Sequence, residues 1–269
     1  MNDHTQQLLL RIAQYAATTT GTFLLNQRPD HLGHSAKSSA TDVVTEMDHA
    51  AESLLVDLIL RSRPYDAVLG EEGTARTGST GVTWVIDPID GSTNYLYDLP
   101  IWSVSVGVQV DGYPTIGVVE IPALGVSYWA VKGQGAWSAS RAGVRTVTSN
   151  RTTEVSQALV ATGFGYRAQT RQVQGNVLAQ VLPHIRDIRR AGAASIDMCW
   201  VADGLVDAYF EQGLHPWDYT AATVIAREAG AVVDGLWASE PGELMTYAAA
   251  PLVADELRSV LLSAHGAEL

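Results

Sequence analysis

Two aspartates three residues apart, Asp87 and Asp90, follow directly on an apolar run and are the clearest sign of chemistry in the chain. The run at 82–86 (VTWVI) has the β-branched and aromatic residues typical of a buried strand. Pro88 removes a backbone donor, so we expect the strand to end at Asp87. Two carboxylates held close together on a rigid strand end repel each other. A bound cation would offset that repulsion, although a plain Asp-Pro-x-Asp-Gly turn is the simpler alternative.

Three other segments place acidic side chains after an apolar run or at the expected start of a helix. Glu71 lies in GEEG (70–73) after a short apolar run, Asp218 opens a helix expected at 217–230, and Asp48 completes a capping-box pattern with Thr45. Taken singly, these residues fit a solvated loop, a charge on a helix dipole and a helix cap. Hard cations such as Mg2+ prefer oxygen ligands, so one metal site would explain all of the segments together. The candidate ligands are Glu71, Asp87, the backbone carbonyl of Ile89, Asp90 and Asp218.

The charge of the chain limits its partners. The net charge is −12, which argues against nucleic acid and anionic membranes, because both are bound by clustered Lys and Arg. Metal ions would reverse the local field and let the acidic protein bind a phosphate. If Asp87 bridges two ions, the site would resemble the two-metal clamps of phosphoryl transfer. The spacing Asp-x-x-Asp is not the Asp-x-Asp-x-Thr pattern of enzymes that form a phospho-aspartate.

The elements that must position these residues predict an α/β (α+β) fold in two halves. Helices are expected at 6–25 and from Thr45 to Pro64, with a loop at 27–40 between them. Alternation over 102–110 predicts a half-buried strand, and Asp111-Gly112 predicts a hairpin turn before further strands at 115–121, 126–131 and 135–139. These runs favour helices packed on an antiparallel sheet in residues 1–147. In residues 148–269 strands alternate with helices, which favours a mixed sheet, and the absence of a linker favours one compact body.

Composition places the chain in the cytoplasm. The lone Cys199 excludes an intrachain disulfide and fits a reducing compartment, where we expect it to be a core residue. The N-terminal residues are polar and acidic where a signal peptide would be basic. No apolar run approaches the roughly 20 residues needed to span a bilayer. We therefore expect a cytoplasmic protein without a membrane partner.

Three motifs carry a family resemblance. GEEG at 70–73, WVIDPIDGSTNY at 84–95 and WDYTAATVIAREAG at 217–230 resemble the inositol monophosphatase family of Mg2+-dependent, lithium-sensitive phosphatases. Further matches at 37–48, 117–136 and 192–211 extend the resemblance over nearly the whole chain in the right order. It implies a layered αβαβα sandwich of the type shared with fructose-1,6-bisphosphatase, assembled as a homodimer.

The resemblance also implies residue roles. Glu71, Asp87 and the Ile89 carbonyl would hold a first Mg2+, and Asp87, Asp90 and Asp218 a second, with a third, weaker ion near Glu71. The Ser92 hydroxyl, paired with Asp48, would help Glu71 to position the attacking water. The implied substrate-binding residues are Asp90, Gly91, Ser92, Ala194 and Glu211.

Among the departures from the family pattern, two lie within the acidic motifs. Ser92 stands where the family usually has Thr, which keeps the hydroxyl but loses the methyl group that restricts its rotamers. Gly73 stands where Ser or Thr is common, so one loop hydrogen bond is expected to be missing. Neither departure removes a proposed metal ligand.

The substrate is the least determined feature. Glu211 favours a polyol as substrate, because a carboxylate can accept hydrogen bonds from two adjacent hydroxyls. The best candidate substrate is therefore inositol 1-phosphate. Histidinol phosphate, fructose 1,6-bisphosphate and 3′-phosphoadenosine 5′-phosphate remain alternatives on the same scaffold. A regulatory binding protein that acts through partners is the alternative of a different class.

Three weaker signals have simpler explanations. GFGYRA at 163–168 partly matches a dinucleotide-binding fingerprint, but such a match alone is weak. His215 could touch metal or substrate, although a structural role is more common. The basic cluster of Arg186, Arg189 and Arg190 fits a solvated or subunit-contact face better than a nucleic-acid site.

Overall fold

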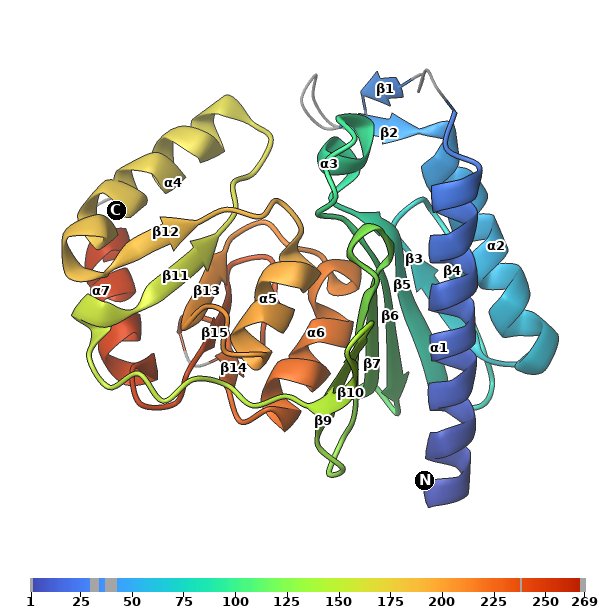
Figure 1. Ribbon diagram of the computed structural model, residues 1–269. Coiled ribbons are helices and arrows are strands. Elements are labelled where there is room, and N and C mark those ends of the chain that lie inside the picture. The colour runs from blue at the N-terminus through green and yellow to red at the C-terminus, as the bar shows by residue number, and fades with distance from the viewer. Residues whose placement is uncertain (1, 30–33, 37–42, 238, 267–269) are drawn as a thin grey trace.

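The chain folds into five stacked layers of helix and sheet. The computed structural model describes residues 2–29, 34–36, 43–237 and 239–266. In Figure 1, helices α1 (Asp3–Asn26) and α2 (Glu46–Ser62) cover the outer face of a large sheet, and α5 (Ala194–Ala202) and α6 (Pro216–Glu228) lie between that sheet and a smaller one. Helices α4 (Ala168–Val181) and α7 (Ala254–Gly266) cover the far face of the smaller sheet. The expected αβαβα sandwich is therefore confirmed.

The large sheet has eight strands and one parallel pair. Its spatial order is β10 (Gly143–Thr146), β9 (Ala136–Ser140), β8 (Val126–Val131), β7 (Tyr113–Ile121), β6 (Ser103–Val110), β5 (Val82–Asp90), β3 (Ala67–Gly70) and β4 (Ala75–Arg76). The purely antiparallel sheet expected for the first half was wrong in one respect, because β3 runs parallel to β5. The parallel pairing brings the carboxyl ends of β3 and β5 to the same edge of the sheet. The loops that carry Glu71 and Asp90 therefore start side by side.

Strand β6 is buried on both faces, which corrects the half-buried strand predicted from its alternating sequence. Its first six residues are all buried, because α6 covers the face that carries Ser103, Ser105 and Gly107. A Cβ at Gly107 would lie 2.7 Å from Cγ2 of Thr220, and one at Gly117 would lie 2.0 Å from the backbone oxygen of Ala221. Small residues on this face thus allow α6, and with it Asp218, to approach the sheet closely. Alternation here reflects small against large residues rather than exposed against buried ones.

The small sheet is mixed, as predicted for the second half. Its order is β12 (Asp187–Arg189), β11 (Leu159–Thr162), β13 (Ala208–Glu211), β15 (Thr246–Ala249) and β14 (Val232–Asp234). Strand β11 pairs parallel with β12 and β13, whereas β15 pairs antiparallel with β13 and β14. Glu211 ends β13 next to the end of β11 at Thr162. This sheet therefore also presents strand ends to the region where function is expected.

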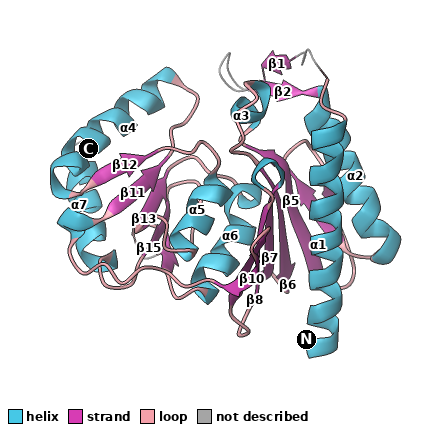
Figure 2. Cartoon of the chain, viewed as in Figure 1, coloured by secondary structure: helices cyan, strands magenta, loops and turns pink. Residues whose placement is uncertain are grey.

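The remaining elements are short (Figure 2). They are β1 (His34–Ala36), β2 (Val43–Thr45), α3 (Ser92–Leu96) and three 3-10 turns at Pro122–Leu124, Val155–Gln157 and Leu182–His184. The loop expected at 27–40 contains strand β1, and residues 30–33 and 37–40 of that loop lie outside the described residues. Residues 37–42 of the matched segment 37–48 also lie outside them. Helix α2 has the predicted capping box between Thr45 and Asp48, and Cys199 is buried in the core as expected. Over the described ranges, no helix combines the length and apolar character needed to cross a membrane.

Candidate active site

A β-bulge places Asp87 and Asp90 at the end of β5. Asp87 lies opposite Ser105 and Asp90 opposite Ser103, so three steps on β5 match two steps on β6. The strand continues to Asp90, and the prediction that it ends at Asp87 was wrong. Pro88 lies inside the bulge, where a missing N–H does not interrupt the ladder. The bulge buries both aspartates, which are 1% and 7% exposed.

The carboxylates around this bulge affect one another strongly. Burial raises the pKa of Asp87 well above its usual value, and the charges of Glu71, Asp90 and Asp218 raise it further. Burial likewise raises the pKa of Asp218, with further contributions from Glu71 and Asp90. The pKa of Asp90 rises to about 6, chiefly through burial, although hydrogen bonds from Ser195 oppose the shift. Buried oxygen donors that repel one another fit a hard divalent cation, which would remove the cause of the repulsion.

Protein hydrogen bonds hold Asp90 and Asp218 in place, and Asp87 accepts one from the N–H of Ile89 at 3.0 Å. Asp90 accepts from the backbone N–H of Ala194 (3.1 Å), from that of Ser195 (2.8 Å) and from the Ser195 hydroxyl (2.5 Å). Asp218 accepts from the N–H of His215 at 2.6 Å, which gives His215 a structural role at the start of α6. Within the described part of the chain, no three His, Cys, Asp or Glu side chains form a ready-made ligand set as they stand. The fit to a metal therefore rests on donor chemistry, burial and mutual repulsion.

Ser92 and Asp48 are in direct contact. The Ser92 hydroxyl lies 3.1 Å from Oδ1 of Asp48 and 3.1 Å from the carbonyl oxygen of Ile89. The other carboxylate oxygen of Asp48 accepts from the backbone and hydroxyl of Thr45, so Asp48 is fixed from both sides. Ser92 opens α3 directly after Gly91, which has φ of 95°. The first N–H groups of a helix have no partner within it and are suited to bind an anion.

A cavity of about 520 Å³ brings most of the predicted residues together. The predicted residues on its wall are Glu71, Asp90, Gly91, Ala194, Glu211 and Asp218. Asp48, Asp87, Ile89 and Ser92 do not line it; the first three are buried, and Ser92 is half-buried at the start of α3. The cavity thus joins the end of the large sheet to the end of the small sheet.

Glu211 occupies the small-sheet side of the cavity. Its Oε2 accepts a hydrogen bond from the Tyr209 hydroxyl at 2.7 Å, and burial raises its pKa to about 7. A Cβ at Gly163 would lie 1.9 Å from the same oxygen, so only glycine fits there. The first glycine of the GFGYRA segment therefore makes room for Glu211, which removes the reason to consider a dinucleotide site. Tyr209 was missed by the sequence analysis, although it lies two residues before Glu211 and so on the same face of β13.

Arg190 does not share the environment of the other two arginines in its cluster. Arg186 bonds to Gln157, and Arg189 pairs with Asp187 at 2.8 Å. Arg190 and Arg167 instead line the cavity, are exposed, and have no ion pair among the residues described. No local pattern separates Arg190 from its neighbours, because the direction of its side chain depends on the bend that follows β12.

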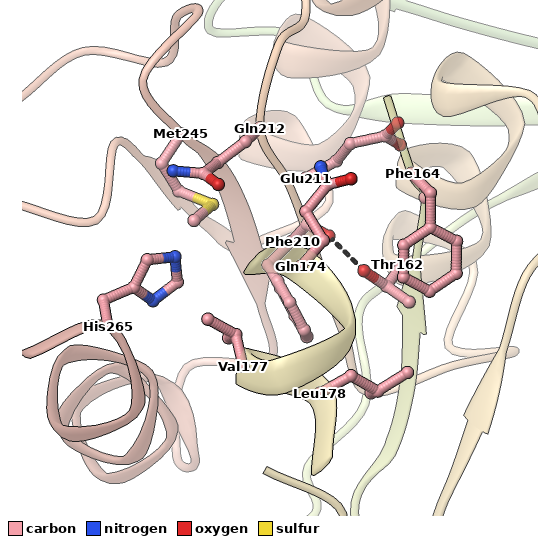
Figure 3. A pocket seen from close by; sticks show the side chains of 11 residues that line it. Thr162, Phe164, Gln174, Val177, Leu178, Phe210, Glu211, Gln212, Met245 and His265 are labelled. Carbon is pink, nitrogen blue, oxygen red and sulfur yellow. Dashed lines mark hydrogen bonds between the residues drawn. The ribbon is translucent and has the colours of Figure 1, made fainter. Parts of the chain in front are cut away.

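A small hollow lies behind Glu211, between β11, β13, α4 and α7 (Figure 3). It shares Gly163, Phe164, Glu211 and Gln212 with the larger cavity. Gln174 of α4 lines it and accepts from the N–H of Gly165 at 2.9 Å, while the Gln174 amide nitrogen is buried without a partner. Room for about one water molecule remains, which would satisfy that nitrogen.

The five-layered fold and its buried carboxylates at adjoining strand ends define an αβαβα phosphatase. The family model described as "Inositol monophosphatase family" matches residues 5–264, and the chain belongs to this family. It is 39% identical over 282 residues to "Inositol-1-monophosphatase SuhB" of Mycobacterium tuberculosis, covering 99% of this chain and 97% of the relative. It is 36% identical over 229 residues to "Nus factor SuhB" of Escherichia coli, covering 84% of each. The solved structure "Mycobacterium tuberculosis SuhB" superposes with a TM-score of 0.84 at 38% identity, covering 97% and 98% of the two chains.

Proposed function

We propose that this protein is a Mg2+-dependent phosphomonoesterase that hydrolyses inositol 1-phosphate to inositol and phosphate. The observation that carries the proposal is a set of mutually repelling carboxylates at one end of a cavity whose other end presents Glu211. Glu71, Asp90 and Asp218 line that end, and Asp87 is buried in the same bulge as Asp90. The first end suits a phosphate bound through metal ions, and the second suits a polyol. The family membership supports the phosphatase class, and the geometry of Glu211 supports the polyol.

Residues of the large-sheet side would hold the metal ions. Glu71, Asp87 and the Ile89 carbonyl are assigned to one Mg2+ and Asp87, Asp90 and Asp218 to a second, with a third near Glu71. When bound, these ions activate the attacking water and stabilise the charge on the leaving oxygen. The Ser92 hydroxyl donates to Asp48 or to the Ile89 carbonyl, which leaves its lone pairs free to accept a hydrogen from the water. The N–H groups of Gly91 and Ser92 receive phosphate oxygens.

Glu211 of the small-sheet side, together with Asp90 of the large-sheet side and Ala194 of α5, would select the substrate. Asp90, Ala194 and Glu211 contact the hydroxyls of the leaving group, with Tyr209 orienting the Glu211 carboxylate. An ionised Glu211 can accept from two adjacent hydroxyls, so substrate binding should strengthen as pH rises through about 7. Arg167 and Arg190 supply positive charge at the wall of an otherwise acidic cavity and attract the anionic substrate.

The test is phosphate release by purified protein with Mg2+. The substrates are myo-inositol 1-phosphate, histidinol phosphate, fructose 1,6-bisphosphate and 3′-phosphoadenosine 5′-phosphate. We expect kcat/KM for inositol 1-phosphate to lead by about tenfold or more, as the difference of one or two well-placed hydrogen bonds allows. If kcat/KM is highest for another substrate, the proposed phosphatase site stands, but the assignment of Glu211 to the hydroxyls of inositol is refuted.

A second candidate function comes from the relatives named "Nus factor SuhB". It is a regulatory protein that acts through a partner, and loss of a metal-ligand residue would favour it. Every proposed ligand is present in this chain, so we place catalysis first. If the wild-type protein hydrolyses none of the four substrates, the regulatory function becomes the first candidate.

Several finer properties belong to the same proposal. We propose a cytoplasmic homodimer that is inhibited by lithium, with residues 1–147 supplying most metal ligands and 148–269 supplying Asp218 and the substrate contacts. Light scattering of the purified protein tests the dimer, and a LiCl titration of the phosphatase reaction tests the inhibition.

A further inference from the structure

Helix α2 carries two buried carboxylates one turn apart that bond to residues outside the helix. Asp48 is fully buried and Glu52 is 4% exposed. Because they are four residues apart, they lie on the same face of α2. Asp48 accepts from Ser92 at the start of α3, whereas Glu52 accepts from the turn that follows β3. The two loops proposed to hold the metal ions are therefore both attached to one helix.

Glu52 fixes the turn that contains Glu71. Its Oε2 accepts from the N–H of Glu72 at 2.7 Å, and its Oε1 accepts from the N–H of Thr74 at 3.0 Å. The turn is closed by a bond of 2.7 Å from the N–H of Gly70 to the carbonyl of Thr74. Glu71 lies inside this ring of contacts, so its backbone has little freedom to move. Its side chain is left to face the cavity.

Gly70 and Glu52 are sterically matched. A Cβ at residue 70 would lie 2.3 Å from Oε2 and 2.7 Å from the carboxyl carbon of Glu52. The glycine at 70 is therefore required by contact with Glu52. Gly73, by contrast, has φ of 107° and open space around its Cβ position, so its requirement is conformational.

We propose that Glu52 is a positioning residue for the metal ligand Glu71, acting through the backbone of residues 72 and 74. The inference rests on the proposed function, because it assigns Glu71 to a metal. The N–H groups of Glu72 and Thr74 donate to different oxygens of Glu52. A glutamine at residue 52 could accept from one of these N–H groups, but its NH2 group would face the other N–H group, and two donors repel. Partners of this kind, which orient a ligand without touching the metal, typically change metal affinity by about 10- to 100-fold when removed.

The experiment measures Mg2+ binding by isothermal titration calorimetry in wild-type protein, in three single variants and in the double variant Glu52→Gln/Gly70→Ala. Glu52→Gln removes one acceptor, and Gly70→Ala keeps the Glu52 carboxylate but displaces it from the turn. The matched control is Asp207→Asn, since Asp207 is 5% exposed and its carboxylate likewise holds a loop, through Leu159 N–H and two side chains at the opposite end of β13. Melting temperatures of all proteins are recorded without metal.

We expect Glu52→Gln and Gly70→Ala each to weaken Mg2+ binding about 10- to 100-fold. The double variant should bind Mg2+ no more weakly than the single variant with the lower affinity, because both substitutions break the same contact between Glu52 and the turn. Asp207→Asn should stay within about twofold of wild type at a similar loss of melting temperature. At saturating Mg2+, KM for inositol 1-phosphate should be unchanged in Glu52→Gln. If Glu52→Gln does not fold, Gly70→Ala alone decides the question.

Three results would overturn the inference, and they differ in what they say about the proposed function. Mg2+ binding by Glu52→Gln as tight as wild type, or an equal loss in Asp207→Asn, would reduce Glu52 to a structural role while the metal site stands. Absence of Mg2+ binding in the wild-type protein itself would refute the proposed function and the positioning role together.

Discussion

The two walls of the cavity differ in how their charged groups are held. On the large-sheet side Asp48, Glu52 and Asp90 each accept two or more hydrogen bonds from the protein, and the bulge in β5 is buried on both faces. On the small-sheet side Glu211 has one bond from Tyr209, and Arg167 and Arg190 are exposed without ion pairs among the described residues. The first wall is built to keep repelling charges in fixed positions, and the second leaves its charges free to respond to a ligand.

This difference separates chemistry from selection. A wall of fixed carboxylates suits the phosphate, which is common to all the candidate substrates. A wall of loosely held groups suits the leaving group, which distinguishes them. Changes on the large-sheet side should therefore lower kcat for every substrate, and changes on the small-sheet side should alter KM for some of them.

Asp87→Asn should have the largest effect on activity of all the variants. It should lower the activity but raise the stability of the metal-free protein. We expect kcat/KM to fall about 10³-fold or more, since metal stabilisation of transition-state charge is worth several kcal/mol. Without metal the variant should melt at a higher temperature than wild type, because it removes a charge that burial, Glu71, Asp90 and Asp218 all disfavour. Added Mg2+ should raise the melting temperature of wild type only. A variant that is inactive and also less stable without metal would mean that repulsion is not the main feature of this wall.

Ser92→Ala should lower kcat about 10²-fold for all substrates, at the low end of what a positioned proton-transfer group contributes. Ser92→Thr should keep or increase activity, because it retains the hydroxyl that bonds to Asp48 and adds a methyl group that restricts its rotamers. The comparison is made at saturating Mg2+ in both variants. Loss of activity in Ser92→Thr would show that the site has no room for the methyl group.

Glu211→Gln should raise KM for inositol 1-phosphate about tenfold with little change in kcat, as expected for one lost charged hydrogen bond. Burial raises the Glu211 pKa to about 7, so the carboxylate is protonated below that pH and ionised above it. In the wild type, KM should therefore fall as pH rises through about 7, and Glu211→Gln should lose this dependence. Phenyl phosphate, which has no hydroxyls to bind, serves as the control for titration of the phosphate itself. A fall in kcat for both substrates would place Glu211 in the chemistry rather than in selection.

The sequence predicted the two walls unequally. On the large-sheet side, Asp87, Asp90 and Glu71 stand out because one metal site explains their segments together and because they lie in the motifs of the family resemblance. Glu52 did not stand out, because an acid within a helix pattern is usually solvated, and its burial against Gly70 becomes visible only in the folded structure. The bulge at Pro88 and the parallel pairing of β3 with β5 were missed because both depend on which strand lies alongside, which local sequence does not encode. On the small-sheet side, Arg190 had no local signal, because its direction depends on the bend after β12, whereas Tyr209 could have been found from its position two residues before Glu211 on β13.

Arg190→Gln should have the smallest effect and the strongest dependence on salt. We expect kcat/KM to fall a few-fold at low ionic strength and to match wild type at about 0.5 M salt, where exposed charges are screened. Arg189→Gln is the matched control, since Arg189 is an exposed neighbour that pairs with Asp187 and does not line the cavity. Arg190 also lowers the pKa of Glu211, so Arg190→Gln should move the pH dependence of KM upward, and Arg189→Gln should not. A fall in kcat/KM of about 10²-fold that persists at high salt would mean that Arg190 makes a fixed, direct contact with the substrate. The small-sheet wall would then hold its charges as firmly as the large-sheet wall does, which would contradict the difference between the two walls.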